Sequence, residues 1–392
     1  MMISFSEALN LLLEQLSPVN SEHIRIEDVS GRVLRQEIQA DRDFPPFDRV
    51  MMDGFAMRVV DYSISRCFEV QGCAPAGQAA VTLSNVPMSC IEVMTGAPMP
   101  IGADCIVPVE ETVRSANNVI VAESFDPVVG RFIHRSGSDA AKDEVLLRSG
   151  VLLGSREIGV AASFGAVELL VSVRPQITVI PTGDELVAVD ALPMPHQIRQ
   201  SNGHAIRASL RSAGYPSVLK EPLKDDDNGD ALRRALESSD WLILTGAVSK
   251  GARDFVPQLL DTIGCRKLFH GVAQRPGKPI GCWLGPCGQI VVALPGNPVS
   301  ALTCLHAFVL PALACASGLP LPKRRHVTPT DTLPGLSGMT HHLPVVLSDD
   351  GRARPAPTGN SGDFIGLLTS DGFVTLPPQG EVPNGLPFTP WI

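Results

Sequence analysis

The chain has 392 residues, of which 44% are hydrophobic and 19% are charged, a composition typical of globular proteins with a packed core. Its 35 glycines and 34 prolines indicate many turns, which excludes a coiled coil or a solenoid of long helices. The formal net charge of −9 disfavours nucleic acid and acidic membranes as partners, but it does not exclude a small anionic substrate.

The cysteines and the N-terminus indicate the compartment. Nine cysteines are scattered without a CxxC pair, which favours reduced thiols, and the closest pair, Cys282 and Cys287, is interpreted as structural. The N-terminus lacks the basic and apolar regions of a signal peptide, and no apolar run approaches the roughly 18 residues of a membrane span. We therefore expect a soluble, cytoplasmic protein.

The first 173 residues predict one helix followed by a β-rich region. Ser4 and Glu7 have the spacing of a capping box, and apolar residues follow at helical intervals from Phe5 to Leu16. From residue 41 to residue 183, short β-rich stretches alternate with turn clusters, which predicts an all-β or mixed module. Within it, a helical pattern over 156–165 ends in glycine and precedes a strand over 166–173.

Beyond residue 174, strands and helices alternate as in βαβ units. We expect strands over 177–180, 241–244 and 290–294, and helices over 202–213, 230–237 and from Pro298 to about Cys315, with Asn297 as a possible N-cap. The three strands run into glycine-bearing loops at 181–185, 245–251 and 295–298. Because ligands bind outside the carboxyl ends of parallel strands, these loops should line one crevice. After Gly318, a proline-rich linker leads into strand-and-turn sequence.

The loops have the chemistry of a phosphate site, because glycine lets backbone N–H groups approach an anion closely. Neither a Walker sequence nor a spaced GxGxxG occurs, which disfavours a standard nucleotide site. Carboxylates at Asp184, Glu185, 225–227 and Asp254 could hold Mg²⁺, although 225–227 could equally form a solvated turn and helix cap. Lys278, between Pro276 and Pro279, is either a fixed anion contact or an ordinary exposed lysine.

The upstream half contains a stiff loop, DRDFPPFDRVMMDGFA, in which Asp53 precedes Gly54 at a possible sharp turn. Thr95 lies in a second turn, MTGAPMP, which could be a plain strand exit. The histidines show no metal-ligand spacing, since the side chains of His341 and His342 should point apart. No Ser-His-Asp or Cys-His arrangement can be proposed from spacing.

Together these motifs resemble the MoeA family, the molybdopterin molybdenumtransferases that share a domain with the C-terminal part of gephyrin. The resemblance covers roughly residues 1 to 318 in order, and NSGDF near Ser361 fits the last domain of the family more loosely. The motifs are GRVL, PPFD with MDGFA, AGQ, MTGAPMP with GAD, RSGSD, PTGDEL, QI with SN, the aspartate cluster, VSKGARDFV, RPGKP and LPGNPVSA.

The resemblance implies a multidomain α/β plus β fold in an elongated homodimer. Each subunit would have a discontinuous N-terminal linker and dimerisation domain (1–47 and 140–173), a β-rich domain (48–139), a MogA-like α/β molybdopterin-binding domain with a mostly parallel sheet (174–318) and a small C-terminal β domain (319–392). The active site would lie between the α/β domain of one subunit and the β-rich domain of the other. Other cofactor-biosynthesis proteins are among the partners that it implies.

The implied reaction inserts molybdate into adenylylated molybdopterin and releases AMP, with Mg²⁺ assisting. The resemblance assigns catalytic roles to Asp53, Thr95, Asp139, Glu185, Asp254 and Lys278, and metal binding to Glu185, Asp225, Asp226 and Asp254. It assigns substrate binding to Thr182, Gly183, Asp184, Gly246, Ser249, Gly251, Arg275, Pro295, Gly296, Asn297 and Pro298.

Three departures from the family pattern keep alternatives open. Many members have Ser-Gly-Gly where this chain has Thr245-Gly246-Ala247, an apolar residue at Lys250 and lysine at Arg275. Lys250 could touch phosphate or point to solvent. A pterin-binding carrier without turnover and a tungstate-handling paralogue are therefore the alternative functions.

Overall fold

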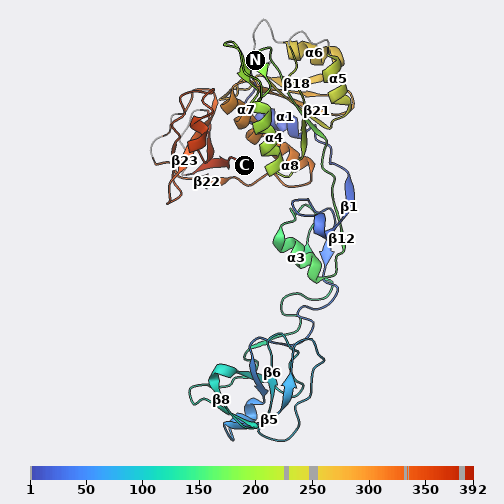
Figure 1. Cartoon of the computed structure of the whole chain (residues 1–392), viewed down its shortest axis with the longest axis vertical. Coiled ribbons are helices and arrows are strands. Elements are labelled where there is room, and N and C mark those ends of the chain that lie inside the picture. Colours follow the sequence, from blue (N-terminus) through green and yellow to red (C-terminus); the bar gives the residue numbers. More distant parts are fainter. Residues whose placement is uncertain (1, 225–228, 247–254, 331–332, 334, 379–384) are drawn as a thin grey trace. The chain divides into compact units, whose positions relative to one another are not determined.

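A computed structural model describes residues 2–224, 229–246, 255–330, 333, 335–378 and 385–392 (Figure 1). The chain divides into two compact units, which are described separately. Unit 1 consists of Met1–Arg35, Ser149–Gly154 and Glu168–Ile392, and unit 2 consists of Gln36–Arg148 and Ser155–Val167. The four-domain division expected from the sequence stays a prediction.

Unit 1 contains a six-stranded sheet in the order β16-β13-β17-β21-β20-β18. The first four strands are parallel and the last two are antiparallel to their neighbours. The strands are β13 (Ile177–Pro181), β16 (Ser217–Leu219), β17 (Trp241–Gly246), β18 (Arg266–His270), β20 (Gly281–Leu284) and β21 (Ile290–Pro295). The predicted mostly parallel sheet is therefore present, while β16, β18 and β20 were not predicted.

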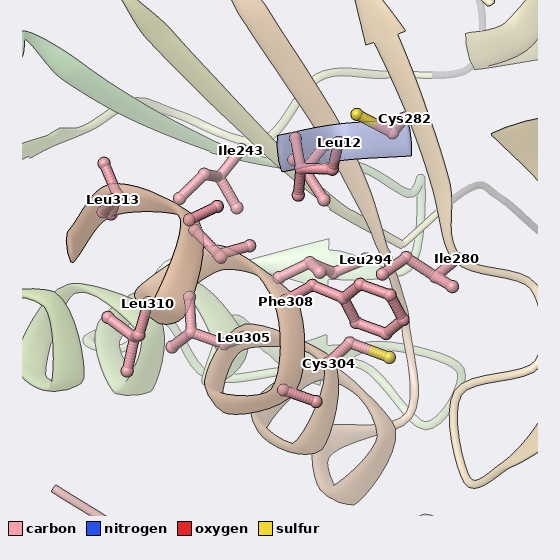
Figure 2. Packing of buried hydrophobic residues seen from close by; sticks show 14 of the residues in the cluster. Leu12, Ile243, Ile280, Cys282, Leu294, Cys304, Leu305, Phe308, Leu310 and Leu313 are labelled. Atoms are coloured by element: carbon pink, nitrogen blue, oxygen red, sulfur yellow. The ribbon is translucent and has the colours of Figure 1, made fainter. Parts of the chain in front are cut away.

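Helices cover both faces of this sheet because apolar side chains alternate along its strands. Ile243 and Leu294 face one layer of helices and Leu242 and Ala293 face the other. The first layer holds α1 (Phe5–Leu13), α4 (Asn202–Ser212), α7 (Pro298–Cys304), η3 (Leu305–Val309) and α8 (Leu310–Ala316). The second holds α5 (Asp230–Glu237) and α6 (Phe255–Ile263). Figure 2 shows Phe308 and Leu305 of the first layer near Leu294 and Ile243.

Local signals placed the helix starts. Ser4 caps α1 as predicted, because its side chain accepts a hydrogen bond of 3.2 Å from the Glu7 N–H. Asn297 stands at the N-cap position of α7, but its side chain forms no capping hydrogen bond. Instead it donates to Ser361 Oγ at 2.8 Å. The predicted N-cap position is therefore correct, but the predicted capping by the side chain is wrong.

The helix that begins at Pro298 corrects one expectation. It runs continuously to Ala316 and is long and apolar enough to cross a membrane by length and composition, contrary to the statement that no apolar run approaches that length. However, 72% of the apolar window is buried inside the molecule, as in a core helix. Its middle turn, η3, is π-helical, and Pro311 follows it at the start of α8.

The C-terminal region of unit 1 forms a second sheet in the order β19-β23-β25-β26-β22, with β24 paired to β23. Its strands are β19 (Gln274–Arg275), β22 (Arg325–Val327), β23 (Thr340–Leu347), β24 (Ala353–Pro355), β25 (Gly372–Leu376) and β26 (Leu386–Pro390), with η4 at Gly366–Thr369. Strand β19 belongs to the α/β segment yet pairs in parallel with β23. The RPGKP turn therefore begins at the edge of the C-terminal sheet.

Two short pairings complete the described part of unit 1. Strand β1 (Ser21–Arg25) pairs antiparallel with β12 (Glu168–Ser172), and η1 (Ile26–Asp28) follows β1. Strand β14 (Leu186–Val187) pairs in parallel with β15 (Ile198–Arg199). The strand expected over 166–173 is β12, so its pairing partner lies at the beginning of the chain.

Unit 2 is β-rich, as the turn clusters predicted. Its main sheet has the order β7-β4-β6-β5-β9-β8, with an apolar cluster on each face. The elements are β2 (Ile38–Gln39), β3 (Arg49–Val50), β4 (Gly54–Met57), α2 (Val59–Tyr62), β5 (Cys67–Ala74), β6 (Ser89–Val93), β7 (Cys105–Pro108), η2 (Val109–Glu111), β8 (Thr112–Ser115), β9 (Asn118–Val121), β10 (Ile133–His134), β11 (Val145–Leu147) and α3 (Ser155–Ser163). Of these, α3 matches the predicted glycine-ended helix.

Candidate functional site

The three glycine-bearing loops of unit 1 leave one edge of the sheet. Strands β13, β17 and β21 are neighbours, with Pro181 opposite Thr245 and Gly246 opposite Pro295. Because all three strands are parallel, their carboxyl ends lie side by side. The three strand ends from which the loops leave therefore lie at one edge of the sheet, as the sequence predicted.

Hydrogen bonds fasten these loops together. The Thr182 N–H donates to the Thr245 carbonyl at 2.8 Å, and the Thr245 hydroxyl donates to the Pro295 carbonyl at 3.2 Å. Asn202, at the start of α4, donates from Nδ2 to the Gly296 carbonyl at 2.6 Å and to Thr245 Oγ1 at 3.3 Å. Thr182 and Thr245 are buried, so they build the floor of the loop cluster.

Gly246 is required for this packing. Its φ is +137°, and a Cβ atom there would lie 2.0 Å from the Thr182 carbonyl oxygen. Any larger residue would force the β13 and β17 loops apart. The glycine that ends β17 therefore has a packing reason in addition to its possible role beside an anion.

The RPGKP turn is held from beneath by buried residues. Gly277 has φ +91°, and a Cβ atom there would lie 2.3 Å from Cys304 Sγ. Gln274 donates from Nε2 to the Gly277 carbonyl at 3.2 Å and to Cys304 Sγ at 3.4 Å. Burial raises the pKa of the Cys304 thiol, which keeps it neutral beneath the turn. The turn consequently presents its two cations, Arg275 and Lys278, outward.

A cleft of about 860 Å³ opens between this turn, the β21 loop and the C-terminal sheet. Its cationic lining is Arg275 and Lys278, both exposed, and neither has an ion-pair partner in the part of the chain that the structure describes. No carboxylate is among the described lining residues, although the whole chain carries −9. This cleft is therefore a local positive region suited to a small anion.

The wall opposite the turn was not anticipated from the sequence in this detail. Ser361 accepts from Asn297 Nδ2 at 2.8 Å, and its carbonyl accepts from the Val299 N–H at 3.2 Å. Asn360 and Thr358 line the cleft beside it. Asp363 shapes the same loop by accepting from the N–H groups of Gly359 and Gly366 at 2.8 and 2.9 Å. The motif NSGDF was the signal that could have placed this wall.

Of the predicted substrate residues, Gly246, Arg275, Pro295, Gly296 and Asn297 line the cleft together with Lys278. Thr182 and Gly183 lie in the neighbouring loop without lining it, and Pro298 follows Asn297 at the start of α7. Asp184 and Glu185 are exposed in that same neighbouring loop. The Glu185 carboxylate lies over Gly183, where an added Cβ atom would be 2.6 Å from Oε2.

Several predicted site residues lie outside the described residues. They are Asp225, Asp226, Ser249, Gly251 and Asp254, together with Ala247 and Lys250. Three of the four predicted metal ligands are among them, and only Glu185 is described. Within the described ranges, no group of three or more His, Cys, Asp or Glu side chains could hold a metal ion. The Mg²⁺ site thus stays a prediction.

Unit 2 brings Asp53 and Thr95 together. The Asp53 carboxylate accepts from the N–H and the hydroxyl of Thr95 at 2.6 and 2.7 Å. These bonds lower the pKa of Asp53, so this exposed carboxylate stays ionised to a lower pH than a free aspartate. The next residue, Gly54, allows β4 to lie close to β7, since a Cβ atom there would lie 2.0 Å from the Val107 carbonyl oxygen.

Asp139 lies elsewhere in unit 2, at the end of a series of hydrogen-bonded side chains. Arg49 Nη2 donates to His134 Nδ1 at 3.0 Å, and His134 Nε2 lies 2.7 Å from Asp139 Oδ1. Because a guanidinium can only donate, Nδ1 accepts and the His134 proton is on Nε2, donated to Asp139. The hydrogen bond from His134 lowers the pKa of Asp139. Sequence reasoning missed both Arg49 and His134.

Family models account for most of the chain. The "MoeA N-terminal region (domain I and II)" matches residues 3–165, a "Probable molybdopterin binding domain" matches 178–314 and the "MoeA C-terminal region (domain IV)" matches 327–388. A molybdopterin molybdenumtransferase of Synechocystis sp. is 34% identical over 403 residues and covers 100% of both chains. Molybdopterin molybdenumtransferase 2 of Mycobacterium tuberculosis is 35% identical over 337 residues, covering 83% of this chain and 82% of its own length.

A solved structure has the same fold. The molybdopterin biosynthesis moeA protein from Pyrococcus horikoshii OT3 has a TM-score of 0.81 and 26% identity, covering 99% of this chain and 98% of its own. The predicted multidomain α/β plus β fold class is therefore confirmed. Full-length identity above 30%, together with matches to the N-terminal, central and C-terminal family models, shows that the chain belongs to the MoeA family.

Proposed function

We propose that this chain is a molybdopterin molybdenumtransferase, which inserts molybdate into adenylylated molybdopterin and releases AMP in molybdenum cofactor biosynthesis. The observation that carries the proposal is the cleft beside Arg275 and Lys278, with no carboxylate among its described lining residues in a chain of charge −9. Family membership supports it, because the Synechocystis sp. relative carries this activity in its name.

The described residues suit binding and orientation of anionic groups. Lys278 and Arg275 have no ion-pair partner among the described residues, and the RPGKP turn holds them at fixed backbone positions because Gln274 and Cys304 block its movement inward. Asn297 and Ser361 form the polar opposite wall. Phosphate groups and an oxyanion can thus be held between fixed cations and neutral donors, an arrangement that favours displacement at phosphorus.

In the proposed reaction, water breaks the phosphoanhydride bond of the adenylate, and one phosphate stays on AMP and one on the pterin. The two dithiolene thiols bind molybdenum and give their protons to one molybdate oxygen, which leaves as water. Lys278 and Arg275 would stabilise the phosphate charge as that bond breaks. We propose Mg²⁺ at Glu185 with Asp225, Asp226 and Asp254, where it would neutralise phosphate charge when bound.

The assay measures two products in one reaction. The purified chain is given adenylylated molybdopterin and molybdate, and AMP and pterin-bound molybdenum are quantified over a single turnover. Equal amounts of both products support the proposal. A carrier would bind the adenylate without producing AMP, which would refute it. A competition between molybdate and tungstate in the same reaction distinguishes the tungstate-handling paralogue.

We further propose a cytoplasmic homodimer in which Asp53, Thr95 and Asp139 of one subunit complete the cleft of the other. The proposal rests on the family resemblance, and subunit mixing tests it. Variants Asp53→Ala and Lys278→Gln should each keep at most about a tenth of parent activity, yet an equal mixture of exchanged subunits should recover about a quarter of it, since half the dimers then have one intact site. If mixed dimers are shown to form and activity does not recover, Asp53 and Lys278 of one site belong to the same subunit and the proposal is wrong.

A further inference from the structure

A chain of polar side chains runs through the interior of unit 1 from the C-terminal sheet to the RPGKP turn. Arg324 Nη1 lies 3.4 Å from Thr375 Oγ1, which lies 3.2 Å from His342 Nδ1. His342 Nε2 lies 3.4 Å from Gln274 Oε1, and Gln274 Nε2 lies 3.2 Å from the Gly277 carbonyl. The chain therefore ends on the residue before Lys278.

Its central members are sealed from water. His342 is 0% exposed and Gln274 is 1% exposed. The His342 ring meets the rings of Phe5 and Phe373 edge to face, at centroid distances of 4.9 and 5.4 Å. A buried polar group without a partner costs roughly 1–3 kcal/mol, so each of these groups depends on its neighbour in the chain.

The direction of each hydrogen bond follows from the carbonyl at the end. A backbone carbonyl only accepts, so the Gln274 amide donates to Gly277 and presents Oε1 to His342. His342 then carries its proton on Nε2 and accepts at Nδ1 from the Thr375 hydroxyl, which accepts from Arg324. Burial, together with Arg324 and His341, lowers the pKa of His342 to about 3, which keeps this neutral form at physiological pH.

The last step of the chain decides where the turn lies. Gln274 contacts both the Gly277 carbonyl and Cys304 Sγ, the atom that closes the space beneath Gly277. The Lys278 carbonyl accepts from the Val272 N–H at 2.9 Å, and the Gly277 carbonyl accepts from the Ile280 N–H at 3.1 Å. A displaced Gln274 would therefore move the backbone that carries Lys278.

We infer that His342 is a positioning residue for the anion cleft: through Gln274 it fixes the turn that presents Lys278 and Arg275. The C-terminal sheet then acts on the cleft in two ways, since it supplies the Ser361 wall and also sets the cations of the facing turn. The identity of the substrate in this inference rests on the proposed function, whereas the position of the turn rests on the hydrogen bonds alone.

The kinetic test compares His342→Phe with His342→Gln. Phenylalanine keeps the ring contacts and removes both hydrogen bonds, whereas the glutamine amide can still donate to Gln274 Oε1. We expect His342→Phe to raise KM for adenylylated molybdopterin about tenfold, because the phosphate contacts of Lys278 and Arg275 are displaced, and to lower kcat as well, because the same cations stabilise the charge of the breaking bond. His342→Gln should restore KM to within about threefold of the parent.

Thr389→Val is the matched control. Its hydroxyl is buried in the same C-terminal sheet, on β26, without a hydrogen-bond partner in the described structure. We expect this variant to leave KM unchanged. If Thr389→Val and His342→Phe raise KM equally, or if His342→Gln fails to restore it, His342 serves packing alone and the inference is wrong.

Hydrogen exchange tests the positioning without any assumption about substrate. In His342→Phe, peptides covering 272–280 should exchange at least about tenfold faster, because the Val272 and Ile280 amides depend on the turn, and Thr389→Val should not change them. If His342→Phe exchanges faster but the parent makes no AMP, the inference stands and the proposed function is wrong. If the parent makes AMP but His342→Phe exchanges at the parent rate over 272–280, the inference is wrong and the proposed function stands.

Discussion

Replacing Gly277 by alanine should damage unit 1 by two separable effects. The first is conformational, because φ is +91° and an L-residue there costs about 1–2 kcal/mol. The second is steric, because the new Cβ atom would lie 2.3 Å from Cys304 Sγ and 2.9 Å from Gln274 Nε2, an overlap that typically costs about 1–3 kcal/mol. The expected loss in the free energy of unfolding is therefore about 2–5 kcal/mol.

Gly288→Ala separates the two effects. Gly288 lies in the same unit with φ +86°, and nothing lies within 4 Å of its added Cβ atom. This control should cost only the conformational part, about 1–2 kcal/mol. In addition, Cys304→Ala should relieve Gly277→Ala, because it removes the nearest atom, so the double variant should be more stable than the sum of the two single changes predicts.

Tryptophan emission during urea unfolding is the appropriate assay. The chain has three tryptophans, and Trp241, Trp283 and Trp391 all belong to unit 1, so their emission follows that unit without unit 2. Equal losses for Gly277→Ala and Gly288→Ala, or additive effects of Gly277→Ala and Cys304→Ala, would refute the packing described beneath the turn.

Three further predictions concern other groups. Asp53→Asn should keep the turn with Thr95 yet lose molybdenum insertion, whereas near-parental activity in single turnover would assign Asp53 a structural role. The pKa of Asp139 is lowered below its usual 3.8, chiefly by the His134 hydrogen bond, so it stabilises unit 2 above that pH and the contribution disappears as the pH falls through the lowered value. The stability difference between the parent and Asp139→Asn, measured by hydrogen exchange of unit 2 peptides, should thus shrink below about pH 4; a constant difference would contradict this. Finally, Cys67, Cys73 and Cys287 are exposed and should react with a thiol reagent in the folded chain, while Cys282, Cys304 and Cys90, whose pKa burial raises, should react only after unfolding; rapid native labelling of Cys304 would contradict its burial.

Sequence patterns predicted the features of this fold that depend on neighbouring residues. The capping of α1 by Ser4, the bounds of α5 and the starts of β13, β17 and β21 all follow from local spacing, whereas these strands end later than predicted, at Pro181, Gly246 and Pro295. The carboxyl ends of the three strands also lie at one edge as predicted, because the strands are parallel, but residues 181–185 do not line the cleft and 247–251 lie outside the described residues. The RPGKP turn was likewise predicted from its prolines, whereas the exposure of both Lys278 and Arg275 was not.

The features of the fold and the site that were not predicted depend on contacts between residues far apart in the sequence. Gln274 and His342 are 68 positions apart, and Asn297 and Ser361 are 64 apart, so no local period relates them. The adjacent histidines at 341 and 342 had been considered only as metal ligands, because spacing does not reveal that one of them is fully buried. Likewise, the chain from Arg49 through His134 to Asp139 requires the pairing of β3 with β10.

The central claim is that anionic substrates react beside Lys278, and a single-turnover comparison of Lys278→Gln with Lys267→Gln tests it most directly. Both lysines are exposed in unit 1, but only Lys278 lines the cleft. Loss of a charge-assisted contact of about 1.5–3 kcal/mol predicts that Lys278→Gln releases AMP about 10- to 100-fold more slowly at subsaturating substrate, with Lys267→Gln unchanged. Equal rates for the parent and both variants would contradict the account.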